Sequence, residues 1–355
     1  MKQLNENLRQ HLWKGTVIPA HPLALHEDRS IDEYHQRLLT RYYMASGAGG
    51  IAVAVHSTQF EIRDPHINLF ETVLKWASEE IDKANLDRPF VRIAGICGPT
   101  NQAIQEAHIA LRYNYDIGLL SMGGLQGWTE DAILDRVRAV AAIIPVFGFY
   151  LQPSVGGRIF SYDFWCKFVA IENVVAIKCA SFNRYQTLDV MRALANSGRH
   201  DQVVMYTGND DNIVNDLMTT YQFPVAGKTI AIDFKGGLLG HWAVWTQKAV
   251  ALLDEIKAYK KAPDNATADR LLTKAVAVTD TNAAFFDPAN AFHGCIPGIH
   301  QALYRQGLMK GIWCLNPQEI LSPGQEQEID RVHRDYPDLH DDEFVRSFLN
   351  GESAK

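Results

Sequence analysis

The feature that most restricts the fold of this chain is an alternation of short, apolar, β-branched runs with longer segments of helical periodicity. It extends from about Gly15 to about Lys257. Each run is nearly continuously apolar, as expected for a parallel strand that is covered on both faces. The runs predict strands at Thr16–Ala20, Gly50–His56, Phe90–Ile96, Ile117–Met122, Val146–Leu151, Val174–Cys179, Val203–Thr207 and Thr229–Phe234.

The segments between these runs carry apolar residues at intervals of three and four, which is typical of amphipathic helices. They predict helices at Ile31–Ser46, Ile67–Lys83, Asn101–Tyr113, Glu130–Ile143, Tyr162–Ala170, Thr187–Asn196 and Asp211–Tyr221. Eight strands with intervening helices favour an α/β fold that closes into a (β/α)8 TIM barrel. An open, doubly wound sheet is the alternative, and the lack of a GxGxxG run after the first strand argues against it.

The texture of the sequence changes after Lys257 to Ala-, Lys- and Asp-rich helical sequence, followed by a Pro- and Gly-punctuated segment and a charged tail. We therefore expect a barrel with a short N-terminal lead-in over residues 1–257. A C-terminal helical extension that packs on the barrel is expected over residues 258–355.

The composition restricts the class of protein and its partners. With 47% hydrophobic and 21% charged residues, the chain can bury a sizeable core. A net charge of −7 argues against a nucleic-acid partner. The five cysteines are scattered without CxxC spacing, which favours a reducing cytoplasm over a disulfide framework. Since there is no signal-peptide pattern or long apolar run, neither secretion nor a membrane partner is expected.

The sixth predicted strand ends in VVAIKCAS, so that Lys178 follows an apolar run. In a (β/α)8 barrel, the reacting groups lie at the C-terminal ends of the strands. Burial would lower the pKa of the amine until its neutral form, a nucleophile toward carbonyl carbon, is accessible near neutral pH. By position alone, Lys178 could equally extend to solvent or hold a phosphate.

Two further strand ends are polar. The fifth ends in VFGFYLQP, where Tyr150 can point into the barrel mouth and relay protons, or simply pack in the interior. The second ends in AVAVHSTQFE and supplies His56, Ser57 and Thr58. The two hydroxyls can hold a carboxylate or connect Tyr150 to water, although such residues are also ordinary caps and turn formers.

Together these motifs resemble the dihydrodipicolinate synthase and N-acetylneuraminate lyase superfamily, from GTVIPAHPLALHEDRSID through GHWAVW. VHSTQFE resembles the family's Gly-Thr-Thr-Gly-Glu motif, FYLQPSVGG its Tyr-Asn-x-Pro motif, AIKCAS its Gly-Ile-Lys-Asp motif and GNDD its Gly-Asp-Asp type sequence. The separation of Tyr150 and Lys178 along the chain is also typical of the family.

The chain departs from the family pattern at several positions. Val155 stands where the family often has a carboxylate-binding arginine, and Arg158 lies three residues further on. Gln59 and Phe60 replace the glycine and glutamate of the paired-hydroxyl motif. The loop SMGGLQGW lacks the tyrosine that several tetrameric members contribute across an interface. The lysine-biosynthetic reaction is therefore not expected. We expect another aldol cleavage, or a dehydration or hydration of a 2-oxo acid.

The resemblance implies a class I lyase without cofactor or metal, acting on pyruvate or a substituted 2-oxo acid, in a homo-oligomer of two or four chains. Lys178 would form a Schiff base, and Tyr150 and Thr58 would carry protons. The substrate-binding residues would be Ser57, His56, Arg158, Asn209 and Asp210.

Two other functions stay open. A metal-dependent barrel hydrolase would use the strand-end and downstream histidines, although none of them belongs to an HxH or HxxxH pair. These candidates are His21, His56, His241 and His293. A non-catalytic barrel that binds a ligand is the second, because fold alone does not guarantee activity.

Overall fold

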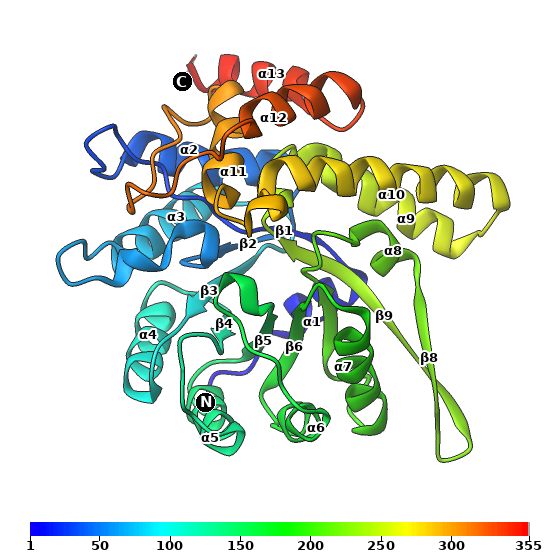
Figure 1. Ribbon diagram of the computed structural model, residues 1–355. Helices are drawn as coiled ribbons and strands as arrows, with labels where there is room; N and C mark the ends of the chain where they lie inside the picture. The colour runs from blue at the N-terminus through cyan, green and yellow to red at the C-terminus, as the bar shows by residue number, and fades with distance from the viewer. Residues whose placement is uncertain (354–355) are drawn as a thin grey trace. The chain divides into compact units, whose positions relative to one another are not determined.

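The computed structural model describes residues 1–353 (Figure 1). The fold is the predicted (β/α)8 barrel with C-terminal helices, and all eight predicted barrel strands are present. By its internal contacts the chain divides into two compact units. Unit 1 comprises residues 1–16 and 91–238, and unit 2 comprises residues 17–90 and 239–355.

Unit 1 is a run of parallel strands with helices on one face (Figure 1). Its strands pair in the order β3 (Val91–Ile96), β4 (Ile117–Ser121), β5 (Val146–Leu151), β6 (Val174–Ala180), β7 (Val204–Thr207) and β9 (Lys228–Leu239). Its helices are α1 (Glu6–Lys14), α4 (Thr100–Arg112), α5 (Glu130–Ala141), α6 (Tyr162–Val169), α7 (Arg184–Asn196) and α8 (Ile213–Met218).

Like α1, which Asn5 caps, three helices that follow strands of unit 1 begin at side chains that satisfy amides of their first turn, which otherwise lack a partner in the helix. Thr129 accepts from the Ala132 amide at α5, and Ser161 accepts from the Phe164 amide at α6. Asn183 caps α7 in the same way. These caps fix the points at which the chain turns from a strand end into a helix.

The strand β8 (Thr220–Val225) was not predicted. It pairs antiparallel with β9, which begins at Lys228, and forms a long ribbon (Figure 1). The segment Asp211–Tyr221 was predicted to be helical, but α8 covers only its middle, and Tyr221 lies in β8. The turn at Ala226 and Gly227 has positive φ at both residues, which matches the twist of a two-residue hairpin.

Unit 2 contains the first two strands, β1 (Val17–Pro19) and β2 (Gly50–Val53), joined by a parallel bridge from Ala20 to Ala52. Its short 3-10 turns η1 (His56–Thr58) and η2 (Phe60–Arg63) follow β2. Its helices are α2 (Glu33–Ala45), α3 (Phe70–Ala84), α9 (Thr246–Lys261), α10 (Asn265–Phe286), α11 (Cys295–Arg305), α12 (Gln325–Asp335) and α13 (Asp342–Ser353).

The predicted division at residue 257 falls inside α9 and stays a prediction. The buried face of α10 includes Leu271, Ala275 and Val278. That helix packs against both α11 and α12. In the part of the chain that the structure describes, no helix combines the length and the apolar character needed to cross a bilayer.

Candidate active site

The strand register of unit 1 places Lys178 in a layer of side chains that face away from the helices. Phe149 of β5 pairs with Lys178 of β6, which pairs with Tyr206 of β7. Residues that pair directly in a parallel sheet point to the same face. The Lys178 Nζ atom lies 4.3 Å from the centroid of the Phe149 ring. In a (β/α)8 barrel, the face away from the helices is the interior.

The amine of Lys178 is buried, with 8% of the residue exposed. Desolvation lowers its pKa to about 8, and the negative charge of Asp210 partly offsets this effect. A substantial fraction of the amine is therefore neutral slightly above neutral pH. A neutral buried amine at the C-terminal end of a strand is the nucleophile that Schiff-base chemistry requires.

Gly208, directly after β7, has no side chain and so leaves room for the side chain of Lys178. A Cβ atom on Gly208 would lie 2.5 Å from Cε of Lys178 and 2.9 Å from Cβ of Ala180. Contacts this short do not occur between real Cβ atoms and their neighbours. The glycine of the GNDD sequence is thus a part of the lysine site, and its role is to admit the lysine.

Tyr150 lies on the opposite face of β5, which contradicts the expectation that it points into the barrel mouth. At the start of the two strands Val146 pairs with Val174, but beyond this pair β6 runs one position ahead, so that Phe149 pairs with Lys178. This register shift after Val146 inserts one extra residue into β6. Tyr150 therefore pairs with Cys179, and Phe149, which has no hydroxyl, stands beside the lysine.

The surroundings of Tyr150 confirm that it faces the helix layer. Its ring centroid lies 4.9 Å from that of Trp165 in α6 and 6.2 Å from that of Phe160. Burial raises the pKa of the phenol to about 12. Among residues 1–353, its buried hydroxyl has no hydrogen-bond partner of ordinary geometry, although the Phe160 amide is near enough to lower the pKa of the phenol. The relay role of Tyr150 remains a prediction, and this position does not favour it.

Both ends of the Asn209 side chain are hydrogen-bonded to other residues of the protein. Its Nδ2 donates to Oδ2 of Asp216 at 2.8 Å, and its Oδ1 accepts from the Phe182 amide at 3.0 Å. Both ends of the amide are thus used to join the loops after β6 and β7. Contact with a substrate hydroxyl would have to compete with these bonds, so the binding role of Asn209 remains a prediction.

Asp216 of α8 is the centre of this network, and sequence reasoning did not identify it. The carboxylate is fully buried. It accepts five hydrogen bonds, from Thr207 Oγ1 at 2.6 Å, Asn209 Nδ2 at 2.8 Å, Asn212 Nδ2 at 3.2 Å, the Tyr221 hydroxyl at 3.2 Å and Arg184 Nη1. Four of its partners lie within nine residues of it along the chain, and Arg184 lies in α7. Nothing in the sequence indicates that these polar residues share one buried carboxylate.

Arg158 is anchored beside α6. Its Nη1 donates to the Trp128 carbonyl oxygen at 2.6 Å, and its guanidinium lies 5.5 Å from the Phe160 ring centroid. It is half-buried. These contacts join the guanidinium to the loop after β4, and its part in substrate binding remains a prediction.

The hydroxyls after β2 bind backbone within unit 2. Ser57 donates to the Ala20 carbonyl oxygen at 2.9 Å, and Thr58 donates to that of His21 at 2.6 Å. Thr58 also accepts from the Val55 amide at 3.2 Å. These bonds join the ends of β1 and β2. The predicted roles of Ser57, Thr58 and the neighbouring His56 in the lysine site remain predictions.

Comparison with known proteins identifies the fold. No family model and no curated protein matches the chain. Among solved structures, dihydrodipicolinate synthase from Oceanobacillus iheyensis is similar, with a TM-score of 0.70 and 17% identity over 93% of this chain and 99% of that one. N-acetylneuraminate lyase from Fusobacterium nucleatum complexed with pyruvate has a TM-score of 0.70 and 16% identity over 91% and 97%. Dihydrodipicolinate synthase from Aquifex aeolicus has a TM-score of 0.71 and 17% identity over 91% and 98%.

The chain shares their (β/α)8 barrel. At these identities the likeness establishes the fold alone, and chemistry has to be argued from the site. The barrel places Lys178 at the end of a strand where such folds carry their reacting groups.

The histidines considered as metal ligands are ordinary parts of the core or surface. His21 is buried with its Nε2 2.9 Å from Oγ1 of Thr40, and burial lowers its pKa to about 4. Burial likewise lowers the pKa of His241 to about 4. His293 is exposed, and the His56 ring lies against that of Phe60. Over the described residues, none of these histidines belongs to a group of three possible ligands.

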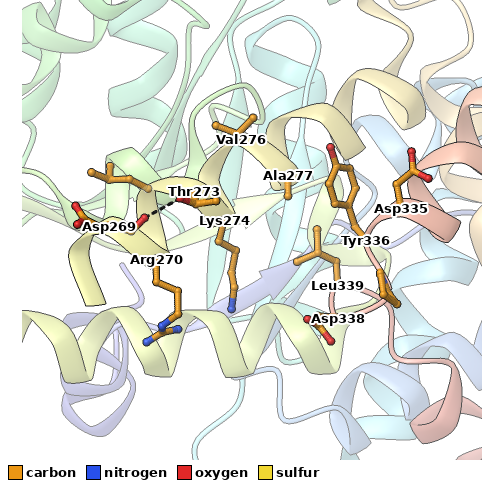
Figure 2. A pocket seen from close by; sticks show the side chains of 12 residues that line it. Asp269, Arg270, Thr273, Lys274, Val276, Ala277, Asp335, Tyr336, Asp338 and Leu339 are labelled. Carbon is orange, nitrogen blue, oxygen red and sulfur yellow. Dashed lines mark hydrogen bonds between the residues drawn. The ribbon is translucent and has the colours of Figure 1, made fainter. Parts of the chain in front are cut away.

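A cavity of about 1080 Å³ lies between α10 and the connection after α12 in unit 2 (Figure 2). Lys274 and Tyr336 line it, but both are already engaged, with Glu255 at 3.0 Å and Asp280 at 2.6 Å respectively. Volume alone does not make a reactive site. The buried amine of Lys178 remains the candidate for chemistry.

Proposed function

We propose that this chain is a divergent member of the dihydrodipicolinate synthase and N-acetylneuraminate lyase superfamily. In this proposal it is a class I lyase that forms a Schiff base between Lys178 and pyruvate or a substituted 2-oxo acid. The observation that carries the proposal is the buried lysine with a pKa of about 8 on the interior face of β6. The solved structures that share the fold include one with pyruvate.

The chemistry follows from a neutral amine in a desolvated site. Nζ of Lys178 attacks the ketone carbon, and loss of water from the carbinolamine leaves a protonated imine. With a 4-hydroxy-2-oxo acid, the C4 hydroxyl then loses its proton as the C3–C4 bond breaks and the imine accepts the electron pair of that bond, which yields an enamine and an aldehyde. Protonation of the enamine at C3 and addition of water then release the shortened 2-oxo acid and restore the amine.

The proton transfers need a group near the amine, and unit 1 offers Asp210. Its charge is what partly restores the pKa of Lys178. Phe149 has no hydroxyl, Tyr150 faces α6, and the Tyr206 hydroxyl donates to the Leu12 carbonyl oxygen at 2.9 Å. We assign to Asp210 the removal of the proton from the amine during imine formation, in place of the tyrosine that the family pattern implies.

The test is borohydride reduction of the protein in the presence of 2-oxo acids, beginning with pyruvate, followed by intact-mass and peptide mass spectrometry. We expect a ligand-dependent mass increase on Lys178 that is absent from Lys178→Ala. Lys235→Ala is the matched control, because Lys235 is also a strand lysine over an aromatic ring, 6.0 Å from the centroid of Trp13. An adduct that persists in Lys178→Ala, or none with a folded wild-type protein, would overturn the proposal.

A second candidate is a barrel that captures a 2-oxo acid as an imine without turning it over. The position of Tyr150 on the helix side favours it, because no phenol accompanies Lys178 on β5, and the phenol of Tyr206 on β7 donates to the Leu12 carbonyl oxygen at 2.9 Å. Exchange of the C3 hydrogens of pyruvate for deuterium separates the two. A lyase that forms the enamine catalyses this exchange, whereas a binding protein forms the reducible adduct and leaves the C3 hydrogens in place.

A further inference from the structure

Two histidines and a carboxylate converge where α12 is followed by α13 in unit 2. His333 lies in the last turn of α12, His340 in the connection, and Asp342 at the start of α13. His333 Nε2 lies 2.8 Å from Asp342 Oδ2, and His340 Nδ1 lies 3.4 Å from the same oxygen. One ligand atom from each residue lies within 4.8 Å of the other two. None of the three serves the lysine site of unit 1.

The surrounding side chains bring these groups together. The imidazole rings of His333 and His340 stack with centroids 4.3 Å apart and planes inclined by 13°, so one ring has to rotate for both nitrogens to face the same ion. Trp245 lies against both rings, at 6.2 and 6.0 Å. The Gln306 Nε2 atom donates to Asp342 Oδ1 at 2.8 Å, which leaves Oδ2 directed at the histidines. A hydrogen bond to the far oxygen of a ligating carboxylate is how proteins orient such ligands.

The spacing of each histidine from the carboxylate fits a metal ion. Nitrogen and oxygen ligands at about 2.1 Å from an ion lie about 3.0 to 3.4 Å from one another in octahedral and tetrahedral geometry. The two distances to Asp342 Oδ2 lie at or close to these values. The buried Nδ1 of His340 has no hydrogen-bond partner of ordinary geometry within residues 1–353, although Asp342 is near. That nitrogen is therefore available as a ligand without breaking another bond.

Space for further ligands adjoins the cluster. His333 and Asp342 line a cavity of about 470 Å³ together with Trp245, Gln306 and Arg305. Such a cavity has room for the water molecules that complete the coordination of an ion held by three protein groups. Glu326 and Asp330, on the same cavity, pair with Arg305 at 3.6 and 2.7 Å and so remain outside the triad.

We propose that His333, His340 and Asp342 bind a divalent transition-metal ion of the Zn²⁺ class. Imidazole nitrogens combined with one carboxylate favour Zn²⁺ and its neighbours over Mg²⁺ or Ca²⁺, which prefer oxygen ligands. The ion would clamp the end of α12 to the start of α13 across the connection that contains His340. This role is independent of the Schiff-base chemistry and departs from the expectation of a protein without metal.

The test uses the full chain without a histidine tag, stripped with a chelator and titrated with Co²⁺ and Zn²⁺. We expect one equivalent of Co²⁺ to bind with visible absorption of nitrogen-ligated cobalt, and Zn²⁺ to displace it. His333→Gln and His340→Gln should each lower the affinity by more than about tenfold. His108→Gln, at an exposed position of α4, is the matched control and should bind as wild type does.

Two outcomes would overturn the site. One is the absence of saturable binding near one equivalent in the wild-type protein. The other is unchanged affinity in both histidine variants, which would place the ion elsewhere. Because His340 lies in a connection, His340→Gln keeps the test valid if His333→Gln disturbs α12, and circular dichroism checks the fold of each variant.

Discussion

Asp216 and Lys178 are two buried charged side chains near the strand ends of unit 1. They lie on opposite faces of the sheet, and their surroundings differ. Asp216 is fully buried on the helix side and accepts five hydrogen bonds, one of them from Arg184. Lys178 is buried on the interior side beside the ring of Phe149, and the negative charge of Asp210 partly offsets the effect of desolvation on its pKa. Hydrogen bonds offset the desolvation of Asp216, whereas the desolvation of Lys178 persists as a lowered pKa.

Under the proposed function, the difference separates a structural charge from a reactive one. A carboxylate that is saturated with donors gains nothing from a ligand, and its removal leaves those donors unsatisfied. An amine held in its neutral form can form a bond with an electrophile. Perturbed pKa values are more frequent at functional sites, and the lowered pKa of Lys178, which comes from burial, supports the proposed function.

The largest effect is expected from Lys178→Met. Methionine fills a similar volume without the amine, so all detectable imine adduct should disappear. The free energy of unfolding should stay equal or rise, because a buried polar group is replaced by an apolar one. Urea unfolding and borohydride trapping measure the two quantities, and a marked loss of stability would mean that the lysine is structural after all.

Asp216→Asn should show the opposite behaviour. It leaves Arg184 and the other donors facing a neutral amide, so we expect a loss of about 3 kcal/mol in the free energy of unfolding. Asp189→Asn is the matched control, since Asp189 forms an exposed pair with Arg192 on α7 and should change stability by less than about 0.5 kcal/mol. If Asp216→Asn were as stable as the control, Asp216 would not be a structural charge, and the comparison with Lys178 would fail.

The pH dependence of imine formation tests the lowered pKa of Lys178. Only the neutral amine attacks, and the pKa of about 8 means that the neutral fraction grows as pH rises through that value. The rate constant for adduct formation with pyruvate should increase about fiftyfold from pH 6 to pH 8 and then level off. A rate that continues to rise toward pH 10.5, the ordinary value for lysine, would show that the amine is not desolvated.

Gly208→Ala should move the amine without removing it. The added methyl group would lie 2.5 Å from Cε of Lys178, so the side chain has to shift. A displacement of this kind should slow imine formation by about tenfold or more. Gly351→Ala, where a Cβ meets nothing within 4 Å, is the control and should trap pyruvate at the wild-type rate. An unchanged rate in Gly208→Ala would show that the position of the amine is not restricted.

The helices, the strands and the position of Lys178 could be predicted from the sequence, because each depends on residues that are neighbours along the chain. Apolar runs and helical periodicity predicted the strands, and a cation at the end of an apolar run predicted Lys178. The face of Tyr150 was not predictable in this way. The separation of Tyr150 and Lys178 along the chain fitted a regular register, but one inserted residue in β6 turns the neighbouring side chain to the other face. Asp216 was not predicted because the sequence does not distinguish a polar residue of α8 that is buried from one that is exposed.

The smallest effect is expected from Tyr150→Phe, and it tests the face on which that side chain lies. The buried hydroxyl has no hydrogen-bond partner of ordinary geometry among the described residues, so its loss should leave the unfolding free energy equal or up to about 1 kcal/mol higher. Imine formation and C3 exchange should change by less than about twofold, because the phenol faces Trp165 and not Lys178. A tenfold loss of exchange in a stable Tyr150→Phe protein would mean that the ligand-bound site uses the tyrosine. The end of β5 would then have to slip by one residue when the substrate binds, and Phe149 would give up its place beside the lysine.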